Sequence, residues 1–365
     1  MRIYLEGKEQ PDSYYEELAL SPPAEDESMV DYSERTFDKK FAIIFNYGEK
    51  HSDLISEHIR NCVSPLIELV GLPPLGLEIT IFIGNYGWTP LGIHKDQQGE
   101  NVLHFHLGPG GKKMYTWDED IYKELTGGKS NNKDIESILD HSKEYPFEAG
   151  DLYYMPWFKN HVGYTGELSV GVTLWFNNPT KRAYASQMLE SIKHQFFKKA
   201  LDVIPNQMNY LESDDAFDDV VSVLQLDEEM YNLPFKDVLK QTQEDFKYCL
   251  MSNAGWQNVP LSLEKKKGYE VNEYESLAGK TVTSKNPFQI LYKKNDGQLL
   301  VYVRGSKIKI KYFKELVEII DRINNYNVIN IDELLTSFSE GFPPEAGLYF
   351  LSLLINKRGI DLIEV

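Results

Sequence analysis

The sequence predicts a closed double sheet of antiparallel strands, followed by a helical segment and a small α+β domain. Between residues 41 and 180, short apolar or alternating runs are separated by turns rich in Gly and Pro. Many short strands of this kind favour a double-sheet barrel, because closure removes the exposed sheet edges. After residue 180 the large apolar residues recur at helical spacing instead. The length of 365 residues also exceeds one typical core, so we expect more than one domain.

The composition is that of an ordinary soluble globular protein, with 42% hydrophobic and 26% charged residues. The formal net charge of -18 opposes broad affinity for nucleic acid or anionic membranes and is compatible with a basic protein or peptide partner. The two cysteines, Cys62 and Cys249, exclude a disulfide framework and fit a reducing compartment. No secretory segment and no run of about 18 apolar residues occurs. We therefore expect a cytoplasmic protein without a membrane segment.

The first part of the chain combines an acidic arm with the start of the β domain. Residues 1–40 are interrupted by three prolines, and we interpret them as an arm on the surface. Residues 41–47 are predicted to form a strand. Residues 51–71 have apolar residues at helical spacing and end at a glycine, which predicts a helix. The apolar run at 77–84 is predicted to be a buried strand.

A hairpin and three further strands complete the predicted β domain, residues 41–180. Residues 101–107 and 112–117 flank the turn sequence GPGG and are predicted to pair as a β-hairpin. An irregular polar stretch follows, which we interpret as an insertion at the mouth of the domain. Three strand-like pieces with Gly-containing turns come next, at 146–156, 160–166 and 167–176.

The remainder of the chain is predicted to form two further parts. Residues 181–255 have the pattern of a helical connector, and the sequence leaves open whether the chain forms a homodimer through it. Residues 256–365 combine a hairpin, built on Asp296 and Gly297, with two or three helices. That combination is typical of a winged-helix-like α+β domain.

Two lysine runs in this last part, Lys265–Lys267 and Lys307–Lys311, are candidates for nucleic-acid contact. Charge runs are more often solvated faces of a fold, and the net charge of the chain opposes such binding. We therefore expect no nucleic-acid partner.

Three residues of the β domain predict a metal site. His94 and Asp96 form an H-x-D pair after a buried strand and a Gly- and Pro-rich turn. Residues i and i+2 of a strand point to the same face, so both side chains can reach one ion. His161, in the segment after GDLYYMP, offers a third ligand. A lone histidine on a strand is more often structural, so the prediction depends on the three occurring together. Two histidines and one carboxylate on one face of Fe(II) leave the opposite face open for a cosubstrate and oxygen.

Several motifs of the β domain resemble a known family. T-P-x-G-x-H-x-D, N-x-x-x-F, G-x-K and G-D-x-x-Y-x-P, followed by a histidine and S-V-G-V-T-L-W-F, are similar to motifs of the JmjC-type cupin hydroxylases. These are Fe(II)- and 2-oxoglutarate-dependent oxygenases, and they include protein asparaginyl and ribosomal-protein hydroxylases. The resemblance covers residues of about 40–180. The connector and the terminal domain resemble the ribosomal oxygenase branch more loosely.

The resemblance implies a double-stranded β-helix (jelly-roll, cupin) core and a cofactor set. It implies that His94, Asp96 and His161 ligate Fe(II) and that 2-oxoglutarate is the cosubstrate. The distal carboxylate of 2-oxoglutarate then needs a cation inside the barrel, and the G-x-K match places it at Lys112. Lys113 remains the alternative, because a slip of one residue exchanges the two faces of a strand.

Pairing across the GPGG turn predicts which residues of the preceding strand point inward. The inward set would be Asn101, Leu103, Phe105 and Leu107. His104 and His106 would then point outward, and we do not expect them to be ligands although they form an H-x-H pair.

Other site residues are implied by the same resemblance. Thr173 would lie near the iron and the cosubstrate. Thr89 would bond the 2-oxoglutarate carboxylate, although it precedes His94 by five residues, where relatives often show a shorter spacing. Asn101 would be an amide that orients the cosubstrate or an iron-bound water. Candidates for lining the substrate entrance are Trp88, Trp117 and Trp157. For any one tryptophan, packing in the core or at the rim is the commoner role.

The implied activity is hydroxylation of a side chain of a protein or peptide, with molecular oxygen as the second cosubstrate. No catalytic group beyond the metal ligands is required, and no G-x-S-x-G or P-loop motif competes. Two alternatives stay open: a small-molecule hydroxylase of the same mechanism in a biosynthetic pathway, and a non-catalytic cupin binding module. The sequence does not indicate which residue or which partner would be modified.

Overall fold

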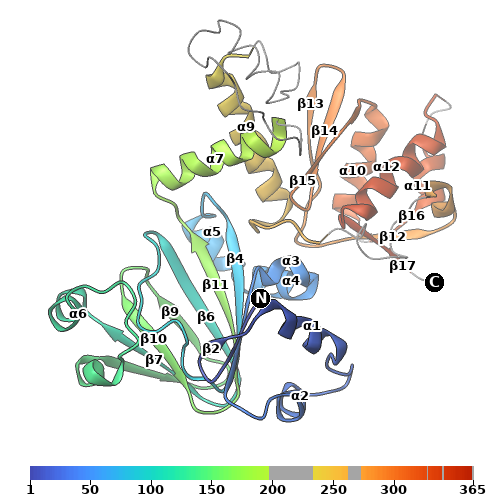
Figure 1. The fold of residues 1–365 in the computed structure, drawn as a ribbon. Helices are drawn as coiled ribbons and strands as arrows, with labels where there is room; N and C mark the ends of the chain where they lie inside the picture. The colour runs from blue at the N-terminus through green and yellow to red at the C-terminus, as the bar shows by residue number, and fades with distance from the viewer. Residues whose placement is uncertain (197–232, 262–272, 327, 339–340, 364–365) are drawn as a thin grey trace, which may run out of the picture. The chain divides into compact units, whose positions relative to one another are not determined.

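The helices and strands of the chain belong to two units. The computed structural model describes residues 1–196, 233–261, 273–326, 328–338 and 341–363 (Figure 1). The first unit comprises Met1–Pro179 and Gly255–Leu261, and the second comprises Thr180–Ala254 and Ser262–Val365. Each unit has its own sheets and its own buried core. Our four-part division of the chain stays a prediction.

The first unit is built mainly of short antiparallel strands. Its strands are β1 (Arg2–Leu5), β2 (Lys8–Glu9), β3 (Phe41–Asn46), β4 (Leu77–Gly84), β5 (Gly87–Trp88), β6 (Glu100–Pro109), β7 (Lys112–Trp117), β8 (Lys143–Phe147), β9 (Leu152–Met155), β10 (Asn160–Thr165) and β11 (Ser169–Asn177). Its helices are α1 (Asp12–Leu20), α2 (Met29–Thr36), α3 (Gly48–His51), α4 (Asp53–Cys62), α5 (Ser64–Val70), α6 (Glu119–Thr126) and the 3₁₀ helix η1 (Glu136–His141).

The strands form two sheets. One has seven strands in the order β2-β1-β3-β4-β11-β6-β9, and the other has four in the order β5-β10-β7-β8. All named neighbours within these sheets are antiparallel. The predicted double-sheet β domain is therefore confirmed. Residues 1–40 contribute more than a surface arm, because β1 pairs with β3 and its Ile3 is completely buried.

The centre of the large sheet is the apolar run LEITIFIG, which forms β4. Its β-branched residues suit a strand that is covered on both faces. On one face Leu77 and Ile79 are completely buried, and helix α3 packs there with Gly48 against Ile79. The buried Glu49 of α3 accepts a hydrogen bond from the Ile79 amide (2.8 Å). The other face of β4 carries the alternate residues and points into the barrel.

The predicted hairpin around GPGG is wrong. β6 pairs with β11 and β9, whereas β7 pairs with β10 and β8 in the other sheet, so the turn carries the chain between sheets. The face of β6 is therefore set by its pairing with β11, where His104 lies opposite Thr173. Leu107, which we expected inside, is 58% exposed, while His104 and His106 are buried. The residues of β6 that we expected to point into the barrel therefore lie on its outer face, and His104 lies on the inner face.

The second unit is a mixed α+β structure. Its elements are α7 (Lys181–Phe196), α9 (Phe235–Ser252), the 3₁₀ helix η4 (Tyr274–Leu277), β12 (Thr281–Ser284), β13 (Leu291–Asn295), β14 (Gln298–Val303), β15 (Ser306–Lys311), α10 (Lys314–Asn325), β16 (Val328–Asn330), α11 (Ile331–Thr336), α12 (Pro344–Asn356) and β17 (Ile360–Ile363). The strands form two sheets, β16-β12-β17 and β13-β14-β15. The predicted hairpin joins β13 and β14, and both Asp296 and Gly297 have positive φ, as a tight turn of this kind requires.

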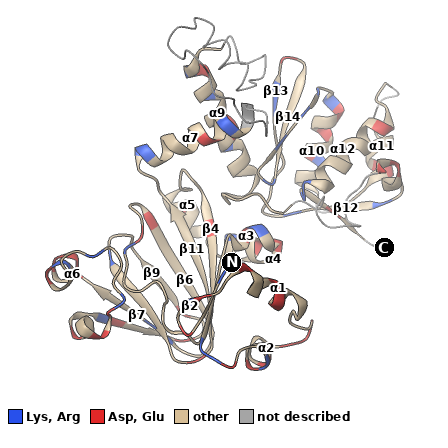
Figure 2. Ribbon diagram, viewed as in Figure 1, with Lys and Arg blue, Asp and Glu red and all other residues tan. Residues whose placement is uncertain are grey.

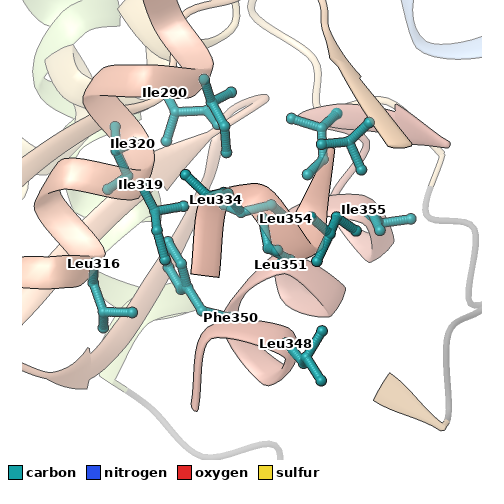
Figure 3. Close-up of a cluster of buried hydrophobic side chains, with 14 of the residues drawn as sticks. Ile290, Leu316, Ile319, Ile320, Leu334, Leu348, Phe350, Leu351, Leu354 and Ile355 are labelled. Atoms are coloured by element: carbon teal, nitrogen blue, oxygen red, sulfur yellow. The ribbon is translucent and has the colours of Figure 1, made fainter. Parts of the chain in front are cut away.

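Amphipathic helices supply the core of this unit. In α10, Leu316, Ile319, Ile320 and Ile323 are almost completely buried and recur at the spacing of one helix face. They pack with apolar residues of α12, of which Phe350 is completely buried (Figure 3). The unit therefore has a core of its own that does not depend on the barrel.

Acidic and basic residues are spread over both units (Figure 2). Of the two lysine runs, Lys265–Lys267 lies outside the described residues. The other run lies on β15, where Lys307 forms an ion pair with Asp245 (2.7 Å). In the described part of the chain, no helix has both the length and the apolarity that a bilayer crossing needs.

Replacing Gly84, at the end of β4, tests how closely β4 and β3 pack in the large sheet. A Cβ at this position would lie 2.1 Å from the backbone oxygen of Phe41 on the neighbouring strand. We expect Gly84→Ala to lower the free energy of unfolding by about 3 kcal/mol, measured by chemical denaturation. Gly7→Ala is the matched control, because Gly7 also has positive φ but faces open space, and we expect it to cost about 1 kcal/mol. Equal losses in the two variants would contradict the role of the close contact.

Candidate metal centre

His94, Asp96 and His161 come together in the first unit. One ligand atom from each lies within 4.8 Å of the others. The two histidines are neighbours in an isolated antiparallel bridge, in which the His161 amide donates to the His94 oxygen (2.8 Å) and the His94 amide donates to the His161 oxygen (3.1 Å). Their ring centroids are 4.4 Å apart. The backbone therefore holds both imidazoles on one side of the site.

Backbone carbonyls determine which nitrogen of each imidazole is free. His94 Nδ1 lies 2.9 Å from the oxygen of Gly92, and His161 Nδ1 lies 3.0 Å from the oxygen of Lys159. A carbonyl oxygen can only accept, so both Nδ1 atoms carry the proton and donate. Both Nε2 atoms are then left with a lone pair, which is the form of histidine that binds a metal.

The carboxylate of Asp96 is buried without a protein partner for its charge. Its side chain is 4% exposed, and Oδ1 lies 3.9 Å from His94 Nε2. Oδ2 is buried and has no hydrogen-bond partner among the described residues. Burial, and after it the charge of Glu100, raises the pKa of Asp96 to about 7.

The two imidazoles are neutral. Burial is the main cause that lowers the pKa of His161 to about 3, and the neighbouring His94 lowers it further. Burial also lowers the pKa of His94. Two neutral imidazoles and one carboxylate that lacks a counter-charge fit a divalent cation such as Fe(II).

The three residues line a cavity of about 170 Å³ inside the barrel. Both sheets contribute to it, because its walls include residues of β4, β6 and β11 on one side and of β7 and β10 on the other. Among the further lining residues are Arg2, Thr80, Thr89, Lys112, Thr173 and Trp175.

The two candidate lysines lie on opposite faces of β7. Lys112 is 5% exposed and lines the cavity, with Nζ 5.4 Å from the ring centroid of Phe82 and 5.9 Å from that of Tyr86. No ion pair joins it to a carboxylate in the described part of the chain. Lys113 forms an ion pair with Glu144 (2.8 Å) instead. Of the two, Lys112 is therefore the cation inside the cavity.

Both predicted threonines line the same cavity. Thr89 Oγ1 donates to the oxygen of Gly163 (2.9 Å). A Cβ at residue 163 would lie 3.0 Å from Thr89 Oγ1 and 3.4 Å from Lys112 Cε, so the glycine lets these two side chains approach each other. Thr173 Oγ1 lies 2.8 Å from Nδ1 of His104. Their binding roles stay predictions.

The expected position of Asn101 beside the metal is wrong. Asn101 accepts a hydrogen bond from the Tyr154 hydroxyl (3.1 Å) and lines a different cavity, of about 490 Å³, together with Leu66 and Val70 of α5. The reason is the exchanged face of β6, which turns Asn101 away from the barrel interior and His104 toward it.

None of the three tryptophans that we expected at the substrate entrance lines the metal cavity: Trp88, Trp117 and Trp157. Trp117 is a core residue, 1% exposed, whose Nε1 donates to the oxygen of Ile138 (3.0 Å). The tryptophan that does line the cavity is Trp175, which donates to Thr80 Oγ1 (3.1 Å). Its place on β11, two residues after Thr173, was a signal in the sequence that we did not use.

The sequence interpretation also missed Arg2 and His104 as cavity residues. No local signal identifies Arg2, because the pairing of β1 with β3 joins residues about forty positions apart. For His104 the signal would have been its position two residues after Val102, because residues i and i+2 of a strand share a face and Val102 also lines the cavity.

Comparisons with known proteins find similarity among solved structures only. No known protein family and no curated protein matches the chain. The crystal structure of the ribosomal oxygenase YcfD from Escherichia coli is 16% identical, with a TM-score of 0.47, and the match covers 99% of this chain and 86% of that one. The YcfD complex with cobalt and 2-oxoglutarate is 15% identical, with a TM-score of 0.44 and coverage of 89% and 79%. A cupin 2 conserved barrel domain protein from Salinispora arenicola is 13% identical, with a TM-score of 0.20 and coverage of 31% and 72%. What this chain binds has to be inferred from its own residues.

Replacing Asp96 tests the metal centre. We expect Asp96→Asn to weaken binding of Fe(II) or Mn(II) by roughly a hundredfold, because the carboxylate supplies the only negative charge among the three ligands. The fold should persist, since Oδ2 makes no hydrogen bond in the described part of the chain. Metal content and calorimetric titration provide the measurement, with His58→Ala on the exposed side of α4 as control. Unchanged metal affinity in Asp96→Asn would show that the carboxylate is not a ligand.

Proposed function

We propose that the chain is an Fe(II)- and 2-oxoglutarate-dependent oxygenase that hydroxylates a side chain of a protein or peptide. The observation that carries the proposal is the presence of two incomplete charge sites in one cavity. A buried carboxylate with two neutral imidazoles lacks a cation, and the buried ammonium of Lys112 lacks an anion. A ligand that chelates a metal through an oxo acid and ends in a second carboxylate would complete both sites. 2-Oxoglutarate has that chemistry.

Five residues of the cavity have a defined task in this proposal. His94 and His161 would hold the metal through Nε2, and Asp96 would hold it through a carboxylate oxygen, which leaves the opposite face of the metal open. Lys112 and Thr89 would bind the distal carboxylate. When bound, Fe(II) and 2-oxoglutarate supply the oxidising chemistry, in which oxygen is consumed and succinate and carbon dioxide are formed. The surrounding sheets exclude water and orient the ligand.

Two further carboxylates support a basic substrate. Glu78 on β4 and Glu100 on β6 each lie two residues before a residue that lines the cavity, Thr80 and Val102. Residues i and i+2 of a strand point to the same face, so both glutamates lie on the face of the large sheet that borders the cavity. Burial, followed by the charges of Glu49 and Glu100, raises the pKa of Glu78 to about 7. Neither carboxylate has an ion pair with Lys or Arg in the described part of the chain. Partly buried carboxylates near the metal ligands favour a cationic group on the substrate.

The adjacent lysines of β7 provide a matched test of cosubstrate binding. We expect Lys112→Met to raise the KM for 2-oxoglutarate by roughly a hundredfold, because it removes the cation that would bind a buried carboxylate. Lys113→Met should leave it unchanged, since Lys113 pairs with Glu144 outside the cavity. The measurement is succinate release from 2-oxoglutarate with Fe(II). Absence of turnover in the unchanged protein would favour the non-catalytic binding module.

A search for modified cell proteins tests the substrate class. We expect Lys- or Arg-rich proteins to gain the mass of one oxygen atom in the presence of this chain, and Asp96→Ala to abolish the gain. Glu100→Gln should weaken binding of a Lys-rich peptide by about fivefold, measured by fluorescence anisotropy. Glu148→Gln, on an exposed loop, is the control. Oxidation of a metabolite and of no protein would favour the small-molecule hydroxylase.

A further inference from the structure

The imidazole of His104 lies inside the barrel, in a place built for it. His104 is 3% exposed and lines the same cavity as the metal ligands. Its ring lies over Gly171 of the neighbouring strand β11. A Cβ at residue 171 would lie 2.3 Å from Cε1 and 2.6 Å from Nε2 of the imidazole, so another residue there would displace the ring. The glycine therefore determines where Nε2 lies.

One nitrogen of this imidazole is bonded and the other is not. Nδ1 lies 2.8 Å from the hydroxyl oxygen of Thr173. Nε2 is buried and has no hydrogen-bond partner among the described residues. The Thr173 hydroxyl, in turn, has only His104 as a side-chain partner in that part of the chain. A buried polar nitrogen without a partner is costly, so its place in a cavity points to a ligand atom as the missing partner.

Nε2 of His104 and the ammonium of Lys112 lie near the same part of the cavity wall. Gly171, under the imidazole, is paired with Phe82 on β4. The ammonium nitrogen of Lys112 is 5.4 Å from the ring centroid of Phe82. The two groups thus lie over neighbouring positions of the large sheet. Burial, and after it the positive charge of Lys112, lowers the pKa of His104 well below its ordinary value, so the imidazole is neutral.

We propose that His104 donates a hydrogen bond from Nε2 to the carboxylate that Lys112 binds, and that the Thr173 hydroxyl selects the required tautomer by donating to Nδ1. The inference rests on the proposed function, in which this carboxylate is the distal one of 2-oxoglutarate. With the proton on Nδ1 instead, the lone pair of Nε2 would face the anion and repel it. The pair of donors, one charged and one neutral, would make the cavity selective for an oxo diacid over an oxo monoacid.

Three ligands separate the two ends of the site. 2-Oxoglutarate has the chelating oxo acid and the distal carboxylate, glutarate lacks the oxo group, and pyruvate lacks the distal carboxylate. We expect His104→Leu to weaken binding of 2-oxoglutarate and glutarate to the Mn(II)-loaded chain by about tenfold or more, measured by calorimetry. Binding of pyruvate and of Mn(II) should stay unchanged, because neither uses the distal end.

Two further variants keep the test independent of folding. Thr173→Val preserves the shape of the side chain and removes the hydroxyl, and we expect about three- to tenfold weaker glutarate binding. His104→Gln retains an N–H near the position of Nε2 and should recover most of the affinity that His104→Leu loses. Thermal unfolding of each variant shows whether the barrel is intact, and if His104→Leu does not fold, Thr173→Val and His104→Gln decide the result.

The outcomes distinguish this inference from the function on which it rests. Unchanged glutarate binding in folded His104→Leu and Thr173→Val would overturn the inference and leave the proposed function in place. An equal loss of pyruvate and glutarate binding would also overturn it, since it would indicate a general structural role for His104. If the unchanged chain binds Mn(II) but not 2-oxoglutarate, the proposed function itself fails.

Discussion

The cost of burying charge governs the first unit. Asp96 and Lys112 are almost completely removed from water inside one barrel, yet no ion pair joins them to each other in the described residues. Uncompensated charges of this kind are strongly unfavourable in a protein interior. The carboxylate of Asp96 lies beside two neutral imidazoles, and Lys112 lies near the hydroxyl of Thr89. Each buried charge therefore has neighbours that suit the binding of a ligand of opposite charge.

Both sheets supply walls of the cavity that contains these charges. His161 and Lys112 come from adjacent strands of the small sheet, at positions that the antiparallel register of β7 and β10 fixes. The large sheet supplies the opposite wall through β4, β6 and β11, with Gly171 leaving space for an imidazole. The carbonyls of Gly92 and Lys159 set the tautomers of His94 and His161, so backbone geometry leaves both Nε2 atoms available to a metal ion.

Local patterns in the sequence predicted much of this site, and non-local pairing limited the rest. The H-x-D spacing and the G-x-K motif are local patterns, and they lead to side chains that the structure brings into one cavity. The expected strand at the H-x-D pair is wrong, because His94 lies in an isolated bridge and Asp96 lies outside any strand. The face of β6 is not local, since it depends on whether GPGG closes a hairpin or crosses between sheets, and the same turn residues permit both. That single choice misplaced Asn101 and turned His104 outward. Trp117 has the commoner of the two roles that the sequence left open, because it is buried in the core and does not line the cavity.

Charge balance explains why a histidine, and not a second lysine, suits the position beside Lys112. The charges of a divalent metal, Asp96, Lys112 and a dicarboxylate cancel one another, and Arg2, which also lines the cavity, adds one positive charge. Another ammonium in place of His104 would leave one positive charge buried without a partner and would repel Lys112 when the cavity is empty. A neutral imidazole would add a directed hydrogen bond without changing that balance. By donating to Nδ1, the hydroxyl of Thr173 would keep the imidazole proton on Nε2, the nitrogen that faces the ligand.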